Sequence, residues 1–233
     1  MLKRAVYALA DSPTFTAWVS RYGMRWGFAQ RFIAGEAIDD VWPSIQELRD
    51  EGMAVTLDYL GESVSDVDAT RVATDTYCAI VEELGRCDNV ASVSLKPTQL
   101  GLSIGTELAE QNIGRIVAAA KEAGNFVRID MEDSPTTTAT LDVFKALRAQ
   151  YDNLGVVVQT YLHRTAADVR ELNSIGAQLR LCKGAYKEPE SVAYQAKEDV
   201  DRNYRELAEL LLQEGHYPAF ATHDDRGTQW DRP

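Results

Sequence analysis

Residues 156–182, VVVQTYLHRTAADVRELNSIGAQLRLC, contain the pattern that decides the fold. A short run rich in β-branched residues ends at Gln159, a longer stretch with helical periodicity follows, and a second short run covers Gln178–Cys182. Short apolar runs bounded by turn residues predict strands, and the stretch between them predicts an amphipathic helix. This segment therefore predicts two strands joined by a helical crossover.

The same alternation of short strand and longer helix repeats along most of the chain. Strict alternation implies parallel strands joined by right-handed crossovers, which leaves a doubly wound sheet or a (β/α)8 barrel as the main choices. The six predicted strands are Ala54–Leu57, Ser92–Leu95, Phe126–Ile129, Val156–Gln159, Gln178–Cys182 and Ala219–Ala221.

Polar clusters that follow the predicted strands favour the barrel. In a parallel array these clusters fall on one face, and barrel enzymes take their chemistry from the C-terminal ends of many strands. A doubly wound sheet concentrates chemistry at one switch point, and the sequence has neither GxGxxG after the first strand nor GxxxxGK[ST]. We therefore predict an α/β protein built as a (β/α)8 TIM-type barrel with six of its eight units visible. The clusters are Asp58–Glu62, Lys96–Gln99, Asp130–Asp133, Gln159–Arg164, Lys183–Tyr186 and Thr222–Asp224.

A helical segment precedes the predicted barrel and an irregular tail follows it. We expect residues 1–53 to form two helices, the first over residues 15–32 and the second ending near Gly52. Residues 54–224 are expected to form an incomplete barrel, and residues 225–233 neither strand nor helix. Six units average roughly 28 residues, so closing eight would need on the order of 60 more. The chain is therefore expected to be truncated at its C-terminus.

Charge and composition exclude several classes of function. The chain has 24 Lys and Arg against 36 Asp and Glu, and the net charge of −12 opposes binding to nucleic acid. Its three cysteines match neither a zinc site nor a disulfide framework, and its three histidines are too scattered for a metal centre. No apolar run approaches the ~20 residues of a transmembrane helix. We therefore expect a cytoplasmic protein with no metal and no transmembrane segment.

Cations at the predicted strand ends are the first candidate site residues. Arg180 and Lys183 lie beside Gly184 and Ala185, a pair that allows close backbone approach, and such a site suits a planar electron-rich ligand. The alternative is a strand end with solvated charges. Lys96 is a further cation at a strand end, and its alternative role is a surface salt bridge.

Three further strand-end side chains are expected near these cations. Asp130 would orient Lys96 by an ion pair, or would cap the N-terminus of a helix. Gln159 would direct its amide into the same opening, or would be a hydrogen-bonded core residue. His223, which follows Thr222, would be a catalytic base or a hydrogen-bonded structural histidine.

Six sequence strings, taken in their order, resemble the proline dehydrogenase family in its monofunctional bacterial type. The match covers nearly the whole chain from Ala54 to Asp224, and the order of the strings makes it specific. The family uses a flavin-bearing (β/α)8 barrel, so the resemblance implies FAD as the cofactor. The strings are TLDYLGE, SLKPTQLGL, VRIDMEDS, VVVQTYLHRT, RLCKGAYKEP and FATHD.

The resemblance also implies a role for each candidate residue. Lys96 would bind the proline carboxylate, and Asp130 would be an active-site carboxylate that holds this lysine in position. Arg180 would lie near the flavin N5, where its permanent charge favours the reduced cofactor. The residues implied to contact FAD are Met131, Gln159, Arg180, Lys183, Gly184, Ala185, Thr222 and His223.

The implied reaction is the oxidation of L-proline to Δ1-pyrroline-5-carboxylate, by hydride transfer from the carbon next to nitrogen to flavin N5. Electrons would pass to a quinone, and this acceptor allows peripheral membrane contact. Family members complete the barrel with two more strands and a helix that supplies two arginines and a glutamate to the substrate. The sequence contains no counterpart of that region, so we expect impaired activity, with Lys96 as the lone clamp on the carboxylate.

Two other interpretations of the residues remain open. Lysines at barrel strand ends, here Lys96 or Lys183, are also the nucleophiles of Schiff-base aldolases and lyases. Trapping of a substrate on lysine would support that chemistry. The second is a truncated, non-catalytic remnant, which a chain without flavin and with a loose, protease-sensitive structure would support.

Overall fold

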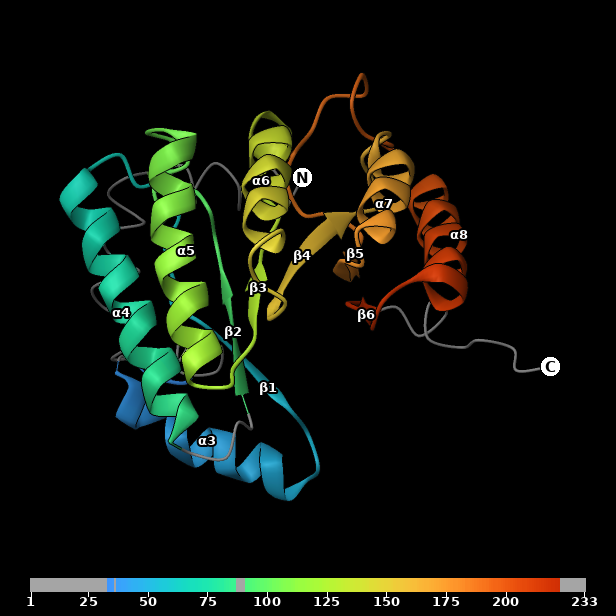
Figure 1. Ribbon diagram of the computed structural model, residues 1–233. Coiled ribbons are helices and arrows are strands. Elements are labelled where there is room, and N and C mark those ends of the chain that lie inside the picture. Colours follow the sequence, from blue (N-terminus) through green and yellow to red (C-terminus); the bar gives the residue numbers. More distant parts are fainter. Residues whose placement is uncertain (1–32, 36, 87–90, 223–233) are drawn as a thin grey trace, which may run out of the picture. The chain divides into compact units, whose positions relative to one another are not determined.

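The computed structural model describes residues 33–35, 37–86 and 91–222 (Figure 1). These residues belong to two compact units that divide after Ala54. The first unit contributes one described helix, and the second contains all of the described strands.

Helix α3 (Ile38–Asp50) is the described helix of the first unit. Asp40 accepts a hydrogen bond from the Ala37 N–H at 3.0 Å, which gives one backbone donor at the helix start a partner. The chain leaves the helix through Gly52, whose φ of 79° costs glycine no steric strain. The prediction of a helix ending near Gly52 is confirmed, whereas the helix predicted over residues 15–32 lies outside the described residues.

The second unit is built around one curled sheet of six parallel strands (Figure 1). Its order is β1-β2-β3-β4-β5-β6, so each strand pairs with the next one along the chain. Parallel neighbours cannot be joined by a tight turn, and a helix supplies each of the connections. The strands are β1 (Val55–Asp58), β2 (Ala91–Leu95), β3 (Val127–Ile129), β4 (Leu154–Gln159), β5 (Gln178–Cys182) and β6 (Ala219–Phe220).

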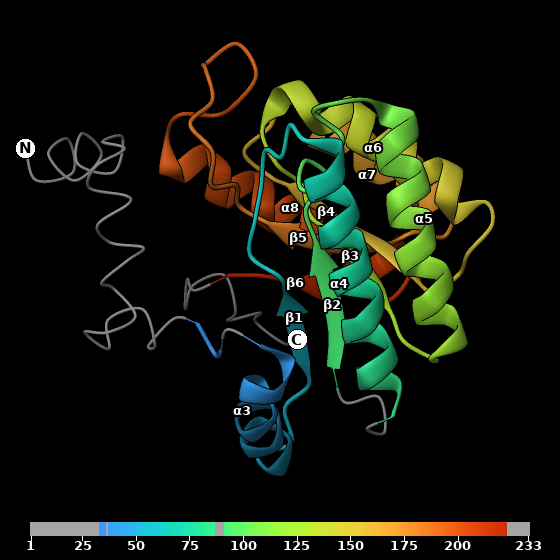
Figure 2. The ribbon, with the colours of Figure 1, turned by 90° about the vertical axis from the view of Figure 1, so that its left-hand side faces the viewer.

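The crossover helices follow one another along the outer face of this sheet (Figures 1 and 2). Each presents an apolar stripe to the strands, as Tyr77, Val81 and Leu84 do in α4, where all three side chains are buried. Helices α4 and α5 also pack against each other. The helices are α4 (Val67–Gly85), α5 (Thr106–Glu122), α6 (Ser134–Arg148), α7 (Thr165–Ser174) and α8 (Lys197–Glu214).

Alternation along the strands gives the sheet an apolar outer face and a polar inner face. Successive side chains of a strand point to opposite faces. Val93 and Leu95 of β2 are fully buried on the helix side, whereas the Ser94 hydroxyl reaches charged groups on the inner side. The inner face therefore carries polar groups that a purely hydrophobic core would exclude. Its polar members in β2 to β5 include Ser92, Ser94, Arg128, Gln159, Gln178 and Arg180.

The predicted fold class is confirmed. The six predicted strands coincide with the observed ones to within two residues at each end, and Gln178–Cys182 agrees at both ends. The parallel curled sheet with helices on its outer face is an α/β half-barrel, the arrangement expected for six units of a (β/α)8 barrel.

Candidate active site

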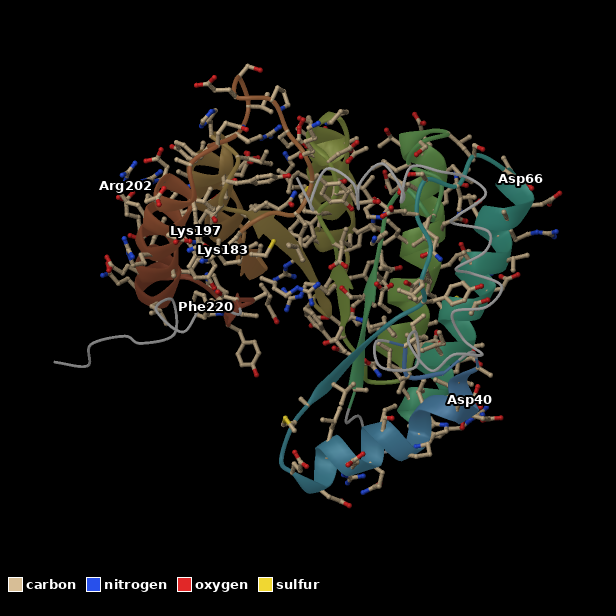
Figure 3. The ribbon with its side chains drawn as sticks, turned by 180° about the vertical axis from the view of Figure 1, so that it is seen from behind. Asp40, Asp66, Lys183, Lys197, Arg202 and Phe220 are labelled. Atoms are coloured by element: carbon tan, nitrogen blue, oxygen red, sulfur yellow. The ribbon has the colours of Figure 1, made fainter. Side chains whose placement is uncertain are left out.

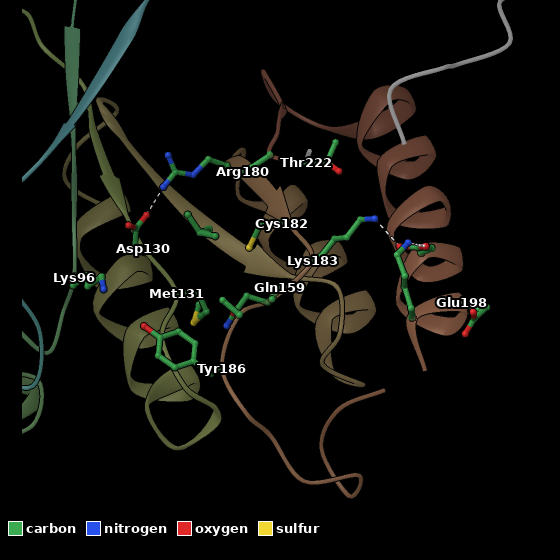
Figure 4. Close-up of a pocket in the computed structure, with 16 residues that line it drawn as sticks. Lys96, Asp130, Met131, Gln159, Arg180, Cys182, Lys183, Tyr186, Glu198 and Thr222 are labelled. Atoms are coloured by element: carbon green, nitrogen blue, oxygen red, sulfur yellow. Dashed lines mark hydrogen bonds and ion pairs between the residues drawn. The ribbon is translucent and has the colours of Figure 1, made fainter. Parts of the chain in front are cut away.

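A cavity of about 1150 Å³ lies at the carboxyl ends of the strands (Figure 4). Its walls come from residues at the ends of β2 to β5, from the segments after β5 and β6, and from the first turns of α8. Every predicted site residue that the structure describes lines this cavity, and His223 lies outside the described residues. The predicted residues in the wall are Lys96, Asp130, Met131, Gln159, Arg180, Lys183, Gly184, Ala185 and Thr222.

Asp130 and Arg180 form an ion pair inside the sheet (Figure 4). Arg180 Nη2 donates to Asp130 Oδ1 and, at 2.8 Å, to Ser94 Oγ. The side chains of Arg180 and Asp130 are 25% and 21% exposed, so neither is a solvated strand-end charge. Asp130 is not a helix cap either, because the nearest helix, α6, begins four residues later at Ser134.

Lys96 pairs with Glu62 and not with Asp130. Its Nζ lies 2.6 Å from Glu62 Oε2, so the predicted Lys96–Asp130 ion pair is wrong. The physical reason is that Arg180 already occupies Asp130, while Glu62 follows the neighbouring strand β1. Burial lowers the pKa of Lys96, but the hydrogen bond to Glu62 and nearby negative groups outweigh burial and raise it above its ordinary value. Lys96 therefore stays a firmly protonated cation.

Glu132 connects the loops after β1, β2 and β3 with the end of β4. Glu132 accepts hydrogen bonds from the Thr98 N–H at 2.9 Å and the Thr98 hydroxyl at 2.6 Å. Thr98 Oγ1 in turn accepts from the Ser63 N–H at 2.8 Å, and Gln159 Nε2 donates to the Glu132 carbonyl at 2.7 Å. Gln159 is thus both a hydrogen-bonded buried residue and part of the cavity wall. These bonds hold the loops that carry Lys96 and Met131.

Gly184 lets the backbone after β5 lie against an aromatic ring. A Cβ at this position would lie 2.2 Å from the Tyr161 ring, and the φ of 110° is a conformation that other residues rarely adopt. The Tyr161 N–H donates to the Lys183 carbonyl at 2.9 Å, which fixes the same segment. The close backbone approach expected at Gly184 is therefore present, and its contact within the chain is Tyr161.

A second charged group in the cavity wall, called the rim cluster, consists of Lys183, Lys197 and Asp201. Figure 3 labels its two lysines, beside α8. Asp201 of α8 bridges two lysines, with Lys183 Nζ 2.6 Å from Oδ1 and Lys197 paired to Oδ2. Burial raises the pKa of Asp201, but the hydrogen bonds from Lys183 and Lys197 outweigh it and lower the pKa below its ordinary value. The rim therefore carries two cations held on one carboxylate.

The residues around the cavity that were not among the predicted site residues include Ser94, Glu62, Asp201 and Cys182. Ser94 was detectable from the alternation in SVSL, which turns its hydroxyl to the same face as Lys96. Glu62 ends the polar cluster Asp58–Glu62 after the first predicted strand, but its pairing with Lys96 depends on the path of that loop. Asp201 gave no signal, because its position depends on the packing of α8. Burial raises the pKa of the remaining residue, Cys182, to about 11, so its thiol stays protonated and unreactive at neutral pH.

Comparison with known proteins identifies the family. The family model described as "Proline dehydrogenase" matches residues 41–230. The chain belongs to the proline dehydrogenase family. Proline dehydrogenase 2 of Bacillus subtilis (strain 168) is 38% identical over 214 residues, which are 91% of this chain and 71% of that protein. The proline dehydrogenase of Deinococcus radiodurans is 36% identical over 231 residues, 97% of this chain and 74% of the relative.

Solved structures of proline utilization A (PutA) share the fold. PutA from Bdellovibrio bacteriovorus, inactivated by N-propargylglycine, aligns with a TM-score of 0.79 at 26% identity and covers 86% of this chain. A bifunctional PutA protein aligns with a TM-score of 0.69 over 91% of this chain, and its 21% identity supports the fold alone. This chain spans about a quarter of each PutA chain, 26% and 25% respectively.

Residues 33–35, 37–86 and 91–222 contain neither a membrane-spanning helix nor a cluster of metal ligands. In that part of the chain, no helix is both long and apolar enough to cross a bilayer. The same residues contain no group of three or more His, Cys, Asp or Glu side chains arranged to hold a metal ion.

Proposed function

We propose that this chain oxidises L-proline to Δ1-pyrroline-5-carboxylate, with FAD as cofactor and a quinone as electron acceptor. The main support is the convergence of Lys96, Asp130 and Arg180 on one cavity, in a chain of the proline dehydrogenase family. Proline offers one carboxylate and one oxidisable carbon next to nitrogen. Oxidation of proline by a flavin involves two negative centres, the substrate carboxylate and the reduced flavin. A fixed cation beside each would stabilise it.

The cavity and its donors fit a large anionic cofactor. Pockets for ordinary small ligands have volumes of roughly 300–1,000 Å³, and about 1150 Å³ leaves room for an extended dinucleotide beside a small substrate. Arg180, Lys183 and the Gln159 amide would face the isoalloxazine and ribityl portions, with Met131, Gly184, Ala185, Thr222 and His223 as further contacts. When bound, FAD would supply the acceptor for hydride from the substrate carbon.

Lys96 would bind the substrate carboxylate. Its raised pKa keeps it protonated, and a charge-assisted hydrogen bond to a carboxylate is stronger than one between neutral groups. In the structure, the carboxylate beside Lys96 is that of Glu62, whose Oε2 lies 2.6 Å from Lys96 Nζ. The substrate carboxylate would replace it. Glu62 is half-exposed and can turn to solvent without the cost of burying an unpaired charge.

Arg180 and Asp130 would control the electrostatics of hydride transfer. Arg180 keeps its charge at any physiological pH, and placed near flavin N5 it would favour the more electron-rich reduced state. Asp130, which follows β3, pairs with the guanidinium that extends from β5, two strands away, and would act as the active-site carboxylate. These two residues supply orientation and charge, and neither needs to form a covalent bond.

The Schiff-base alternative is not favoured. A nucleophilic lysine needs a lowered pKa, and the pKa of Lys96 is raised. The other strand-end lysine, Lys183, lies in an ion pair with Asp201 at 2.6 Å and is not a free amine.

Product formation tests the proposal. The purified chain, loaded with FAD, is incubated anaerobically with a soluble quinone and either L-proline or D-proline, and the Δ1-pyrroline-5-carboxylate is quantified. We expect product only with L-proline, in equal amount to the quinone reduced. An FAD-loaded chain that forms no product from L-proline would contradict the proposal.

A further inference from the structure

Ser94 places one hydroxyl between the two charged groups of the site. Its Oγ lies 2.6 Å from Asp130 Oδ1 and 2.8 Å from Arg180 Nη2. Building on the proposed function, we infer that Ser94 is a positioning residue that fixes the distance and orientation of Asp130 and Arg180 for the reaction. Ser94 itself would touch neither substrate nor cofactor.

The chemistry of the two neighbours fixes the direction of both hydrogen bonds. An ionised carboxylate only accepts and a guanidinium only donates. The single Ser94 proton must therefore go to Asp130, and its oxygen must accept from Arg180. The ion pair and the hydroxyl form a closed three-membered arrangement in which Arg180 only donates, Asp130 only accepts and Ser94 does both. Such an arrangement restricts each side chain more than the ion pair alone would.

The backbone at Ser94 is itself firmly held. The side chain is only 4% exposed, and its carbonyl lies 3.0 Å from the hydroxyl of Tyr77, which is fully buried in α4. The Tyr77 hydroxyl is also 3.1 Å from Asp58 Oδ1. Burial, with the charge of Asp58 next, raises the pKa of Tyr77 well above its ordinary value, so this hydroxyl keeps its proton as a donor. Ser94 therefore transmits the rigidity of β2 and α4 to the site.

A second cation, Arg128, lies on the same face as Arg180. Arg128 extends from β3 on the same inner face, where its Nη1 donates to the Gln178 carbonyl at 2.7 Å. Burial, followed by repulsion from Arg180, lowers the pKa of Arg128 to about 10. The same repulsion acts on Arg180 and favours its displacement from the interior. Asp130 and Ser94 together oppose that displacement, and loss of the hydroxyl leaves Asp130 alone to do so.

The test uses three variants of the FAD-loaded chain. Ser94→Ala removes the hydroxyl, Ser94→Thr keeps it, and Ser92→Ala is the matched control, two residues earlier on the same face of β2. The Ser92 hydroxyl contacts Thr56 at 3.1 Å and neither member of the ion pair. Two quantities are measured for each variant: the anaerobic flavin reduction rate as a function of proline concentration, and the midpoint potential of the bound flavin without substrate.

A specific pattern is expected. Loss of hydrogen bonds to charged groups in Ser94→Ala should lower the limiting reduction rate about 10-fold, with the proline concentration at half-maximal rate changing less than about 3-fold. The midpoint potential should become more negative by up to about 30 mV, which is a tenfold change for a two-electron couple. Ser94→Thr should recover most of both losses, and Ser92→Ala should show neither.

Two results would overturn the role of Ser94: a Ser94→Ala variant that matches Ser92→Ala in both rate and potential, or equal losses in Ser94→Ala and Ser94→Thr. Failure of the proposed function gives a different result. In that case the unsubstituted chain is not reduced by proline, while the midpoint potentials of Ser94→Ala and Ser92→Ala still decide whether the hydroxyl positions Arg180.

Discussion

The cavity has two charged clusters that are equally exposed but differently built. At the inner cluster, Arg180 and Asp130 are 25% and 21% exposed, and at the rim cluster Lys183 and Asp201 have the same two values. The inner pair comes from strands of one sheet and shares the buried Ser94 hydroxyl. The rim pair joins a strand end to helix α8 and shares Asp201 with Lys197, whose side chain is 69% exposed.

This difference separates two tasks. Groups at or next to strand ends that share a third, buried partner have little freedom, which suits the control of a reaction geometry. Long lysines held on one helix-borne carboxylate can change partners at small cost, which suits retention of an anionic ligand at the opening of a cavity. We therefore expect substitutions at the inner cluster to change rates, and substitutions at the rim cluster to change cofactor affinity.

Replacement of Arg180 by Ala should have the largest effect. It removes the fixed cation at the reaction centre and leaves Asp130 without its ion-pair partner, so the rate of flavin reduction by proline should fall on the order of 10²–10³-fold. Stopped-flow reduction under anaerobic conditions measures this rate. Arg202→Ala, on the exposed surface of α8, is the control. Unchanged reduction in Arg180→Ala would remove the inner cluster from the chemistry.

Substitution of Lys96 should affect substrate binding more than rate. Loss of a charge-assisted hydrogen bond to the carboxylate should raise the KM for proline roughly 10–100-fold in Lys96→Ala. Lys121→Ala, an exposed lysine of α5 paired with Asp152, is a matched control for charge. A Lys96→Ala variant with unchanged KM and reduced kcat would assign Lys96 to the reaction step instead.

Lys183→Ala should weaken FAD binding while sparing the reaction. We expect the FAD dissociation constant to rise about 10-fold, because one charged contact is lost, with the reduction rate of the saturated enzyme within about 3-fold of the original. Fluorescence titration of the FAD-free chain measures this affinity. Lys197→Ala should show a smaller rise, since its side chain is mostly in solvent. A large rate loss with normal affinity would contradict the separation of tasks.

Glu132 gives the smallest predicted effect, on stability. Burial raises the pKa of Glu132 above its ordinary value of 4.5, partly offset by the Thr98 hydrogen bonds. A raised folded-state pKa adds stability below about pH 4.5 that is lost as pH rises through the folded value. The free energy of unfolding in urea should therefore fall between pH 4.5 and pH 7 in the unsubstituted chain. It should fall less in Glu132→Gln.

Glu122→Gln, at the exposed end of α5, is the control for that measurement. In this variant the free energy of unfolding should change between the two pH values as much as in the unsubstituted chain. If the free energy of unfolding falls equally in Glu132→Gln and in the unsubstituted chain, ionisation of Glu132 does not affect stability and the prediction is contradicted.

Local pattern was sufficient to predict the strands and the face on which the site lies. In SVSLK, VRID and QLRLC, apolar residues alternate with polar ones, and this pattern fixes both the strand and the side chains that face inward. Parallel pairing then brings the strand ends together, whatever the details of the loops. For this reason the amino-acid sequence alone was enough to group Lys96, Asp130, Gln159 and Arg180 around one cavity.

The pairing of individual charges could not be predicted in the same way. Asp130 had two candidate cations: Lys96 after the neighbouring strand β2, and Arg180 in β5, beyond β4. The choice of Arg180 depends on register and on the reach of the guanidinium to Ser94. The partner of Lys96 depends on the loop after β1, which brings Glu62 within 2.6 Å. Loop paths and helix docking set such contacts, and they leave little trace in local sequence.

The visible spectrum of the purified chain tests most directly whether these strand-end groups form a flavin and proline site. We predict a yellow protein whose flavin absorbance disappears on anaerobic addition of L-proline and returns on addition of a quinone. A chain that binds no FAD, or one whose flavin is reduced by dithionite but not by L-proline, would contradict the account.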